Sequence, residues 1–405
     1  MDLQFSKEDE EFRAEARTWL RAHVPAQRLP SLETESGFAA HRAWEQQLQA
    51  DRWAVVSWPE EYGGRGASLL QWLIFEEEYY AAGAPGRVTQ NGINLLAPTL
   101  FEHGTTEQRA RVLPHMARGT VIWAQAWSEP GAGSDLAALR STARRTEGGW
   151  LLDGSKTWSS RAAFADRAFG LFRSTPVEES GARHRGLTYL MFPLHTAGVT
   201  VRPIGRLDGK PAFAEIFLDS VFVPDRDVIG EPGQGWRAAM STAGNERGLT
   251  LRSPGRFLAA ADRLMALWRR AGDPADTAMA ERVADVVIRA RAYQLFAFAA
   301  ASRISEGRTM GAESSLNKIY WSELDIALHE TALDLLGPDG ELADTGTSSG
   351  PGHGSDHGSD HGSVGDDWAE GYVFSLAGPI YGGTNEIQRD IVAERLLGLP
   401  KGRRG

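Results

Sequence analysis

The chain has 405 residues, of which 42% are hydrophobic and 24% charged, and its formal net charge at pH 7 is −10. This length suits two or three domains with a sizeable buried core, and no apolar run reaches the roughly 18 residues that a membrane-spanning helix needs. The negative charge argues against nucleic acid or an anionic membrane as a partner. Cysteine is absent, which excludes disulfides, thiolate zinc sites and cysteine nucleophiles. With a polar, acidic start that is not typical of a signal peptide, the chain is expected to be cytoplasmic.

Residues 1–121 are predicted to form an all-α domain. Ser6 followed three residues later by Asp9 is typical of a capping box at the start of a helix. Apolar residues then recur at helical spacing, and the same pattern returns over Leu69–Ala82 and Thr106–Met116.

Residues 122–231 change to short apolar runs that predict a β-domain, either a sandwich or a barrel. Asp153-Gly154 lies between two such runs and predicts a hairpin turn there. The other predicted strands lie in Phe169–Phe172, Leu187–Phe192, Val199–Val201 and Phe213–Val223.

Residues 232–405 return to long helical patterns, clearest over Ala280–Ser305 and Leu316–Leu336. One segment, Thr345–Val364, has almost no apolar residues, so little offsets the entropy of ordering it. It predicts a solvated loop; its histidines at 353, 357 and 361 leave weak metal binding as the less favoured reading, and we expect no metal site. The whole chain is thus predicted to be a multidomain α+β protein, in the order α, β, α.

Several nucleotide and hydrolase motifs are missing from the sequence. Gly131-Ala132-Gly133 lacks the third glycine of the dinucleotide-binding fingerprint and does not follow a clear strand, and Gly64-Arg65-Gly66 also fails. No P-loop, HExxH helix or GxSxG elbow is present. A doubly wound nicotinamide enzyme is therefore disfavoured.

Six segments, in order along nearly the whole chain, resemble the acyl-CoA dehydrogenase family. The most specific are the C-terminal Ile380–Arg389, which reads Ile-Tyr-Gly-Gly-Thr-Asn-Glu-Ile-Gln-Arg, and the Pro- and Gly-rich Ser128–Asp135. The other four are Leu3–Ser6, Trp58–Gly66, Asn91–Pro114 and Asp153–Ser160. The resemblance implies two helical domains around a β-domain, the second of them a four-helix bundle, with FAD bound in a cleft.

The resemblance also implies which residues contact the cofactor. Carried over to matching positions, the FAD-binding residues are Gln125, Trp127, Ser128, Ser134, Trp158, Ser160, Thr384 and Glu386. Ser128 is expected at the flavin pyrimidine, Ser134 at the CoA or flavin phosphates, and Thr384 and Glu386 near the pyrophosphate or ribityl chain. Trp158 is expected to pack on the isoalloxazine ring and Ser160 to lie near N5. Taken without the resemblance, a strand tryptophan is more often part of the core, and Ser160 would be a surface hydroxyl.

The catalytic base departs from the commonest family pattern. Many members carry a glutamate directly after the signature tyrosine, where this chain has Gly382. A minority place the glutamate on the helix after the β-domain, immediately before an arginine, and Glu246-Arg247 matches that register. Glu246 is therefore expected to remove the α-proton beside Arg247, although an isolated Glu-Arg pair on a helix is usually solvated. The Gly382 backbone N–H and a flavin ribityl hydroxyl are expected to stabilise the developing enolate.

The resemblance predicts α,β-dehydrogenation of an acyl-CoA, or of a carrier-bound acyl thioester, to the trans-2-enoyl thioester, with an electron-transfer flavoprotein as the acceptor. The helix-borne base favours a bulky or branched acyl group. A homodimer or homotetramer is expected, with a heteromer as the alternative, because Trp268–Pro274 lacks the Arg-x-x-Phe element of many tetrameric relatives. Ala214 also stands where asparagine is expected. The rival hypotheses are a flavin monooxygenase or oxidase on the same fold and a non-catalytic subunit of a heteromeric dehydrogenase.

Overall fold

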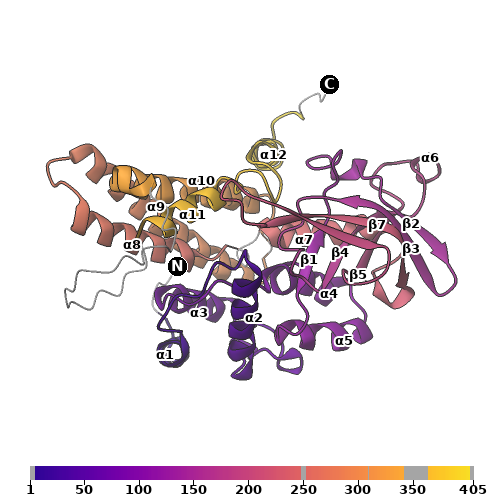
Figure 1. The fold of residues 1–405 in the computed structure, drawn as a ribbon, viewed down its shortest axis with the longest axis horizontal. Helices are drawn as coiled ribbons and strands as arrows, with labels where there is room; N and C mark the ends of the chain where they lie inside the picture. Colours follow the sequence, from indigo (N-terminus) through magenta and orange to yellow (C-terminus); the bar gives the residue numbers. More distant parts are fainter. Residues whose placement is uncertain (1–4, 248–251, 309, 342–363, 402–405) are drawn as a thin grey trace, which may run out of the picture. The chain divides into compact units, whose positions relative to one another are not determined.

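A computed structural model describes residues 5–247, 252–308, 310–341 and 364–401 (Figure 1). The chain forms two compact units. The sheet unit comprises Leu29–Trp72 and Pro85–Leu251, and the helical unit comprises Met1–Arg28, Leu73–Ala84 and Arg252–Gly405. The domain boundaries expected after residues 121 and 231 stay a prediction. The predicted α+β architecture, with strands between two helical regions of the sequence, is confirmed.

The sheet unit contains eight strands and a set of mostly short helices. The strands are β1 (Trp123–Ala126), β2 (Thr142–Thr146), β3 (Gly149–Lys156), β4 (Arg167–Arg173), β5 (Leu187–Pro193), β6 (Val199–Ile204), β7 (Phe213–Pro224) and β8 (Val228–Ile229). The helices are α2 (Glu35–Ala50), η1 (Glu60–Tyr62), η2 (Asn91–Leu96), α4 (Ala97–His103), α5 (Thr106–Ala117), η3 (Leu136–Ala138), α6 (Val177–Ser180), η4 (Asp225–Asp227) and α7 (Gly235–Arg247).

All eight strands belong to one hydrogen-bonded sheet in the order β6-β7-β3-β2-β4-β5-β8, with β1 paired to β4. The joint between β2 and β4 is a single residue pair, Thr142 with Arg173, so the sheet has two halves. Both halves contribute to one apolar core, which includes Phe172 and Phe192 from one half and Ile216 from the other. A core enclosed by strands in this way agrees with the β-domain that the short apolar runs predicted.

The predicted hairpin turn at Asp153-Gly154 is wrong. Both residues lie inside β3, which pairs with β2 and β7, and the β2–β3 turn is made by Glu147 and Gly148. The glycine is needed for a close approach instead: Gly154 has φ +136°, and a Cβ there would lie 2.3 Å from the Ser141 hydroxyl oxygen. Opposite it, the register of β7 shifts by one residue at a bulge, where the Asp153 carboxylate accepts the Ser220 backbone N–H at 2.7 Å.

One helical segment departs from the α pattern. η2 is a π-helix, in which the Ala97 N–H bonds the Gly92 carbonyl, and α4 continues directly from it. Single π turns occur often at functional sites. In α4, the Thr99 hydroxyl contacts the hydroxyl of Thr242 on α7 at 2.6 Å, and both residues are fully buried.

The helical unit is built around the predicted C-terminal bundle, which is confirmed. Its helices are α1 (Lys7–His23), α3 (Leu69–Ala81, from Leu73 on), α8 (Pro254–Ala271), α9 (Thr277–Ser305), α10 (Glu313–Leu336), η5 (Gly337–Glu341), α11 (Val364–Ser375), α12 (Asn385–Ile391) and η6 (Val392–Leu396). Helices α8 to α11 lie alongside one another (Figure 1) and share a core that includes Phe257, Tyr293, Trp321, Leu328 and Trp368. At Gly255, α8 passes so close to α3 that a Cβ would lie 2.5 Å from the Glu76 carbonyl oxygen.

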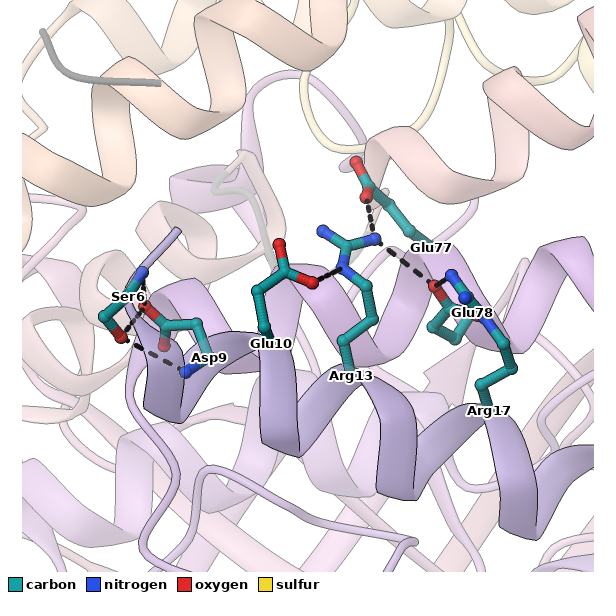
Figure 2. A network of polar contacts seen from close by, with 7 residues as sticks. All are labelled: Ser6, Asp9, Glu10, Arg13, Arg17, Glu77 and Glu78. Atoms are coloured by element: carbon teal, nitrogen blue, oxygen red, sulfur yellow. Dashed lines mark hydrogen bonds and ion pairs between the residues drawn. The ribbon is translucent and has the colours of Figure 1, made fainter. Parts of the chain in front are cut away.

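Two arginines join α1 to α3 within the helical unit. The predicted capping box of Ser6 and Asp9 starts α1, and Figure 2 shows Arg13 and Arg17 reaching Glu77 and Glu78. Arg17 donates from Nε and Nη2 to the two Glu78 carboxylate oxygens, both at 2.8 Å, and Arg13 donates to Glu78 at 3.2 Å. Burial of the Glu78 carboxyl opposes its ionisation, but these two arginines outweigh it and hold its pKa below its ordinary value.

We expect the Glu78 contacts to make stability depend on pH in acid. A carboxyl whose pKa is depressed by folding contributes stability above its unfolded pKa, about 4.5, and loses that contribution as the pH falls through the lower folded value. Glu78→Gln should cost about 1–3 kcal/mol near neutrality and flatten this acid dependence, as measured by urea unfolding between pH 6 and 3.5. Glu11→Gln, at an exposed pair with Lys7, is the control and should change neither value appreciably. An acid dependence that survives in Glu78→Gln would contradict the assignment.

The remaining expectations from the sequence concern membranes and metals. None of the helices in the described ranges combines the length and apolar character needed to cross a bilayer. The same residues hold no cluster of His, Asp and Glu side chains suited to a metal ion. The Thr345–Val364 loop, with its three histidines, lies outside the described residues except for its last position.

Candidate active site

The segment after β3 has an unusual backbone. Trp158 and Arg161 have positive φ angles of 59° and 54°. Residues other than glycine seldom adopt this backbone conformation. Backbone hydrogen bonds hold the segment there: Ser159 exchanges two with Ala214, both 3.0 Å, and the Arg161 N–H donates to Ala212. Such strain persists only where the surroundings fix it, and it concentrates at functional sites.

Trp158 is not part of the core. Without the resemblance, a buried core position was the expectation for it. Its residue is 60% exposed, and its ring meets only the edge of Phe213 among the described aromatic rings, at 5.9 Å between centroids. Exposing the apolar surface of an indole to water is unfavourable, unless a ligand or another surface covers it. The left-handed backbone therefore presents a flat apolar surface outside the sheet.

The other left-handed residue is tied to the N-terminal part of the sheet unit. The Arg161 guanidinium contacts the Glu33 carboxylate at 3.1 Å, and Glu33 is buried. The left-handed conformation costs a non-glycine residue about 1 kcal/mol or more. The ion pair with Glu33 offsets this cost for Arg161. Ser160 is thus held between two strained residues, and its carbonyl accepts the Asn91 amide of η2 at 3.4 Å.

A buried ion pair anchors the Ser128–Asp135 turn to β3. Lys156, which is fully buried, donates from Nζ to Glu129 Oε1 at 2.9 Å and to the Leu171 carbonyl at 2.7 Å. The remaining Glu129 oxygen capacity is taken by the backbone N–H groups of Arg140 and Ser141, at 2.6 and 2.9 Å. Every charged atom of the pair is thus hydrogen-bonded, as a buried pair requires.

Burial and pairing act in opposite directions on this pair. Burial favours the neutral form of Glu129, but Lys156 and the two N–H donors outweigh it and keep the pKa of Glu129 below its ordinary value. For Lys156 burial dominates, and its pKa is lowered despite the carboxylate. We take the pair as ionised near neutrality because each head group has complementary partners.

The pair lies beside both segments that the sequence assigns to the flavin. Glu129 follows Ser128, Lys156 precedes Thr157 and Trp158, and the Thr157 N–H donates to the Ser128 carbonyl at 2.9 Å. The structure therefore brings the Ser128 turn and the Trp158 segment together. Ser134, at the far end of the turn, is exposed.

Two buried polar atoms in this region have no hydrogen-bond partner among the described residues. They are Nε2 of Gln125, on β1, and the hydroxyl oxygen of Ser159, beside Trp158. An unmet buried polar atom costs about 1–3 kcal/mol. Their position next to the two predicted flavin segments fits a polar ligand whose edge would satisfy them.

Trp127 connects this region to α7. Its indole Nε1 donates to the Tyr189 hydroxyl at 3.0 Å, and that hydroxyl contacts the Thr242 hydroxyl at 3.3 Å. Thr242 lies one turn before Glu246, so the chain of hydroxyls fixes the helix that carries the predicted base. Glu246 and Arg247 are the last two residues of α7, and their side chains lie outside the described part of the structure.

The remaining predicted residues lie together in the helical unit. Gly382 and Gly383 have φ of +65° and +80°, and both carbonyls accept the Gln388 side-chain amide, at 2.9 and 3.2 Å. The Gly382 N–H bonds no described residue, so it is free to donate. The Thr384 hydroxyl oxygen caps α12 by accepting the Ile387 N–H, and exposed Glu386 follows on the first turn.

Sequence reasoning missed the residues that support these segments. They are Glu33, Glu129, Lys156, Arg161 and Gln388, together with Arg252, which donates to the Tyr381 hydroxyl, and Lys318, which donates to the Asn385 side chain. Glu129, Lys156 and Gln388 stand inside the quoted motifs, so a polar or charged side chain within a motif was a signal for them. The partners of the others are distant in sequence, and only the fold reveals them.

The three domains of the acyl-CoA dehydrogenase family match almost the whole chain. The N-terminal domain matches residues 6–120, the middle domain 124–221 and the C-terminal domain 233–397. The chain is also 37% identical to acyl-CoA dehydrogenase IpdE1 of Mycobacterium tuberculosis, over 98% of this chain and 99% of that protein. The chain belongs to the acyl-CoA dehydrogenase family. Membership makes it an FAD-dependent oxidoreductase.

Solved structures of this family share the fold over the full length. A structure described as the Tcur3481-Tcur3483 steroid ACAD has a TM-score of 0.85 at 27% identity and covers 99% of this chain and 100% of that one. The ChsE4-ChsE5 complex from Mycobacterium tuberculosis has a TM-score of 0.83 at 29% identity, and the match covers 100% of both chains. The exposed Trp158 and the two unpaired atoms of Gln125 and Ser159 fit the flavin that acyl-CoA dehydrogenases use.

Trp158→Ala tests whether the indole serves the cofactor or the fold. Because the residue is exposed, we expect the free energy of unfolding of the apoprotein to change by less than about 1 kcal/mol. Loss of a stacked ring should raise the FAD dissociation constant by about 10-fold, which is 1.4 kcal/mol. Fluorescence titration with FAD gives the constant. The control is Trp236→Ala, which removes a partly buried tryptophan of α7 that is not assigned to the flavin. Equal FAD affinity in Trp158→Ala and wild type would contradict the flavin role.

Proposed function

We propose that this acyl-CoA dehydrogenase binds FAD through the sheet unit and dehydrogenates an acyl-CoA, with Glu246 as the α-proton base. The observation that supports this most directly is the Trp158 segment, where backbone strain holds an exposed indole beside the Ser128 turn. When bound, FAD would accept the β-hydrogen as a hydride at N5. Ser128, Ser160 and Gln125 would hold the flavin ring, and Ser134, Thr384 and Glu386 the phosphate and ribityl parts.

Glu246 and Gly382 would divide the work on the thioester. The Glu246 carboxylate would take the α-proton, and the negative charge that develops on the carbonyl oxygen would be met by the Gly382 N–H. That N–H is free of described partners and is held by a turn whose carbonyls are both bound. Donors of this kind contribute about 3–4 kcal/mol to acyl-transfer transition states. Arg247 would adjoin the base.

The substrate is proposed to be a CoA thioester of a bulky, fused-ring acid. One prediction and one observation support it. The prediction is the helix-borne base, which is expected among relatives that take bulky acyl groups, and the observation is that a full-length structural relative is described as a steroid ACAD. The electron acceptor is proposed to be an electron-transfer flavoprotein. The cytoplasmic location stays a prediction.

An anaerobic titration of the purified holoprotein tests the function. Steroid-ring propionyl-CoA, isovaleryl-CoA and octanoyl-CoA would each be added while the visible flavin band is followed. Bleaching by the fused-ring thioester alone supports the proposal in full. Bleaching by octanoyl-CoA alone would support the dehydrogenase activity but reject the proposed fused-ring substrate class. A bound flavin that no thioester bleaches would favour an oxidase or monooxygenase on the same fold.

A second candidate is the partner subunit of a heteromeric dehydrogenase. Two full-length structural relatives are described by the names of two proteins each, Tcur3481-Tcur3483 and ChsE4-ChsE5. Light scattering of the chain purified alone distinguishes the candidates. A homo-oligomer that binds FAD and turns over would reject the partner role, and an apoprotein that gains flavin only with a second chain would support it.

A further inference from the structure

A buried arginine in the helical unit lies against the signature tyrosine. Arg252 is 9% exposed, and its guanidinium carbon lies 5.4 Å from the ring centre of Trp321, 5.6 Å from Phe374 and 5.5 Å from Tyr381. It donates to the Tyr381 hydroxyl from Nη2 at 2.6 Å and from Nε at 3.2 Å. Aromatic faces and a polar acceptor together make burial of the cation tolerable.

Both partners are fixed in place. The Arg252 carbonyl accepts the hydroxyl of buried Tyr293 at 2.7 Å, immediately before α8 begins at Pro254. Burial raises the pKa of Tyr381, against the opposing effect of Arg252, so the phenol is neutral near pH 7 and accepts the two bonds. The arginine therefore acts as a rigid donor to a neutral hydroxyl.

Tyr381 begins the turn that carries the Gly382 N–H. From the C-terminal side of this turn, Gln388 binds the glycine carbonyls, and the Asn385 N–H closes the turn onto the Pro379 carbonyl at 2.8 Å. Lys318 of α10 in turn donates to the Asn385 side chain at 2.8 Å. On the N-terminal side, the Tyr381 N–H donates to the Ala377 carbonyl at 3.1 Å, and Arg252 makes the described hydrogen bonds of the Tyr381 side chain. The two left-handed glycines between these anchors have no side chains to hold them.

We propose that Arg252 is a positioning residue for the reaction. Through two hydrogen bonds to the Tyr381 phenol, it fixes the peptide between Tyr381 and Gly382, and so aims the Gly382 N–H at the thioester carbonyl oxygen. This rests on the proposed function, in which that N–H stabilises the enolate. Arg252 itself exchanges no proton and touches no reacting atom. Misplacing a catalytic group by about 1 Å can cost about 100-fold in rate.

Three variants separate this role from simple stability. Arg252→Met removes the donors and keeps the length, Arg252→Lys keeps the charge and one donor, and Tyr381→Phe removes only the acceptor. The matched controls are Tyr320→Phe, whose hydroxyl bonds the α9 backbone, and Arg282→Met at a half-exposed pair with Asp334.

Two measurements do not depend on turnover. Hydrogen exchange of the peptide covering residues 379–385 in the substrate-free holoprotein should be at least 10-fold faster in Arg252→Met and Tyr381→Phe. With acetoacetyl-CoA as the probe, the pH at which the bound enolate forms its long-wavelength band with the oxidised flavin should rise by about one unit, a 10-fold weaker enolate stabilisation. Arg252→Lys should shift both values less, and the controls should match wild type.

The steady-state result expected is a fall in kcat of about 10- to 100-fold, with KM within about 3-fold, in Arg252→Met and Tyr381→Phe. Wild-type exchange, enolate ionisation and kcat in Tyr381→Phe would overturn the inference, and this variant decides the matter if Arg252→Met does not fold. If an acyl-CoA bleaches the wild-type flavin and the variants behave like wild type, only the positioning role is rejected. A wild-type protein that neither bleaches nor ionises acetoacetyl-CoA removes the proposed function and the positioning role with it.

Discussion

Replacing Glu246 with glutamine is expected to slow flavin reduction by about 10³- to 10⁴-fold, the upper range for loss of a general base. The amide keeps the size of the carboxylate but cannot accept the α-proton at neutral pH. FAD binding should be unchanged, because the predicted FAD contacts lie on β1, the Ser128 turn, the Trp158 segment and the start of α12, and none lies on α7. Anaerobic stopped-flow with the best acyl-CoA measures the rate constant, and the flavin spectrum before mixing measures occupancy.

A neighbouring carboxylate supplies the control for Glu246. Glu102 of α4 is exposed and accepts a hydrogen bond from the Ser241 hydroxyl. Ser241 lies on α7, the helix that also carries Glu246. Glu102→Gln should therefore leave the reduction rate within about 2-fold of wild type, the small effect typical of exposed contacts. Loss of rate in Glu102→Gln with full activity in Glu246→Gln would reject the assigned base.

The base can also be moved. Glu246→Gln combined with Gly382→Glu puts the carboxylate after the signature tyrosine, as in many family members. We expect part of the lost rate to return, although not all of it, because φ at this position is +65° and a side chain there costs about 1 kcal/mol or more. No recovery in a folded, flavin-loaded double variant would argue that Gly382 does not adjoin the thioester.

Lys156→Met is expected to destabilise the fold by about 3–5 kcal/mol, the cost of leaving a buried charge without its partner. Glu129 would keep two backbone donors but lose the cation 2.9 Å away. Because Glu129 follows Ser128 and Lys156 precedes Thr157, the flavin content of the purified protein should fall as well. Urea unfolding of the apoprotein gives the stability, which separates it from the effect of bound FAD.

Two comparisons sharpen the Lys156 result. Arg144→Met, at an exposed pair with Asp153 on the neighbouring strands β2 and β3, should cost less than about 1 kcal/mol. Lys156→Met with Glu129→Gln should cost less than the sum of the single changes, because the second change removes the unpaired charge. Strictly additive costs, or a loss below 1 kcal/mol in Lys156→Met, would show that the two groups do not interact as described.

Local sequence patterns were sufficient for the α, β, α order and for the approximate bounds of the elements that they located. Helical periodicity located Leu69–Ala82, found as Leu69–Ala81, and short apolar runs located β4, β5 and β7. The failure at Asp153-Gly154 has a simple origin. A turn glycine and a glycine that admits a neighbouring side chain both carry positive φ and look alike in a sequence, and only the pairing partner of the strand distinguishes them.

The candidate site was less predictable than the fold because its supports act across long sequence separations. Lys156 reads as an exposed strand residue until β4 and the Ser128 turn cover it. Arg161 gains its partner, Glu33, from 128 positions away. The predicted cofactor and base residues themselves rest on family resemblance, and the side chain of Glu246 lies outside the described residues.

The π turn at Asn91–Leu96 restricts how this chain can change length. A π turn holds one residue more than an α turn, and each residue added to or removed from a helix rotates everything after it by about 100°. Thr99, three residues beyond the turn, meets Thr242 only at its present rotation. Substitutions here can change the side chains by small steps. A single-codon insertion or deletion instead rotates α4 and changes at once which of its residues face α7. The contact between the Thr99 and Thr242 hydroxyls therefore depends on one discrete helical register.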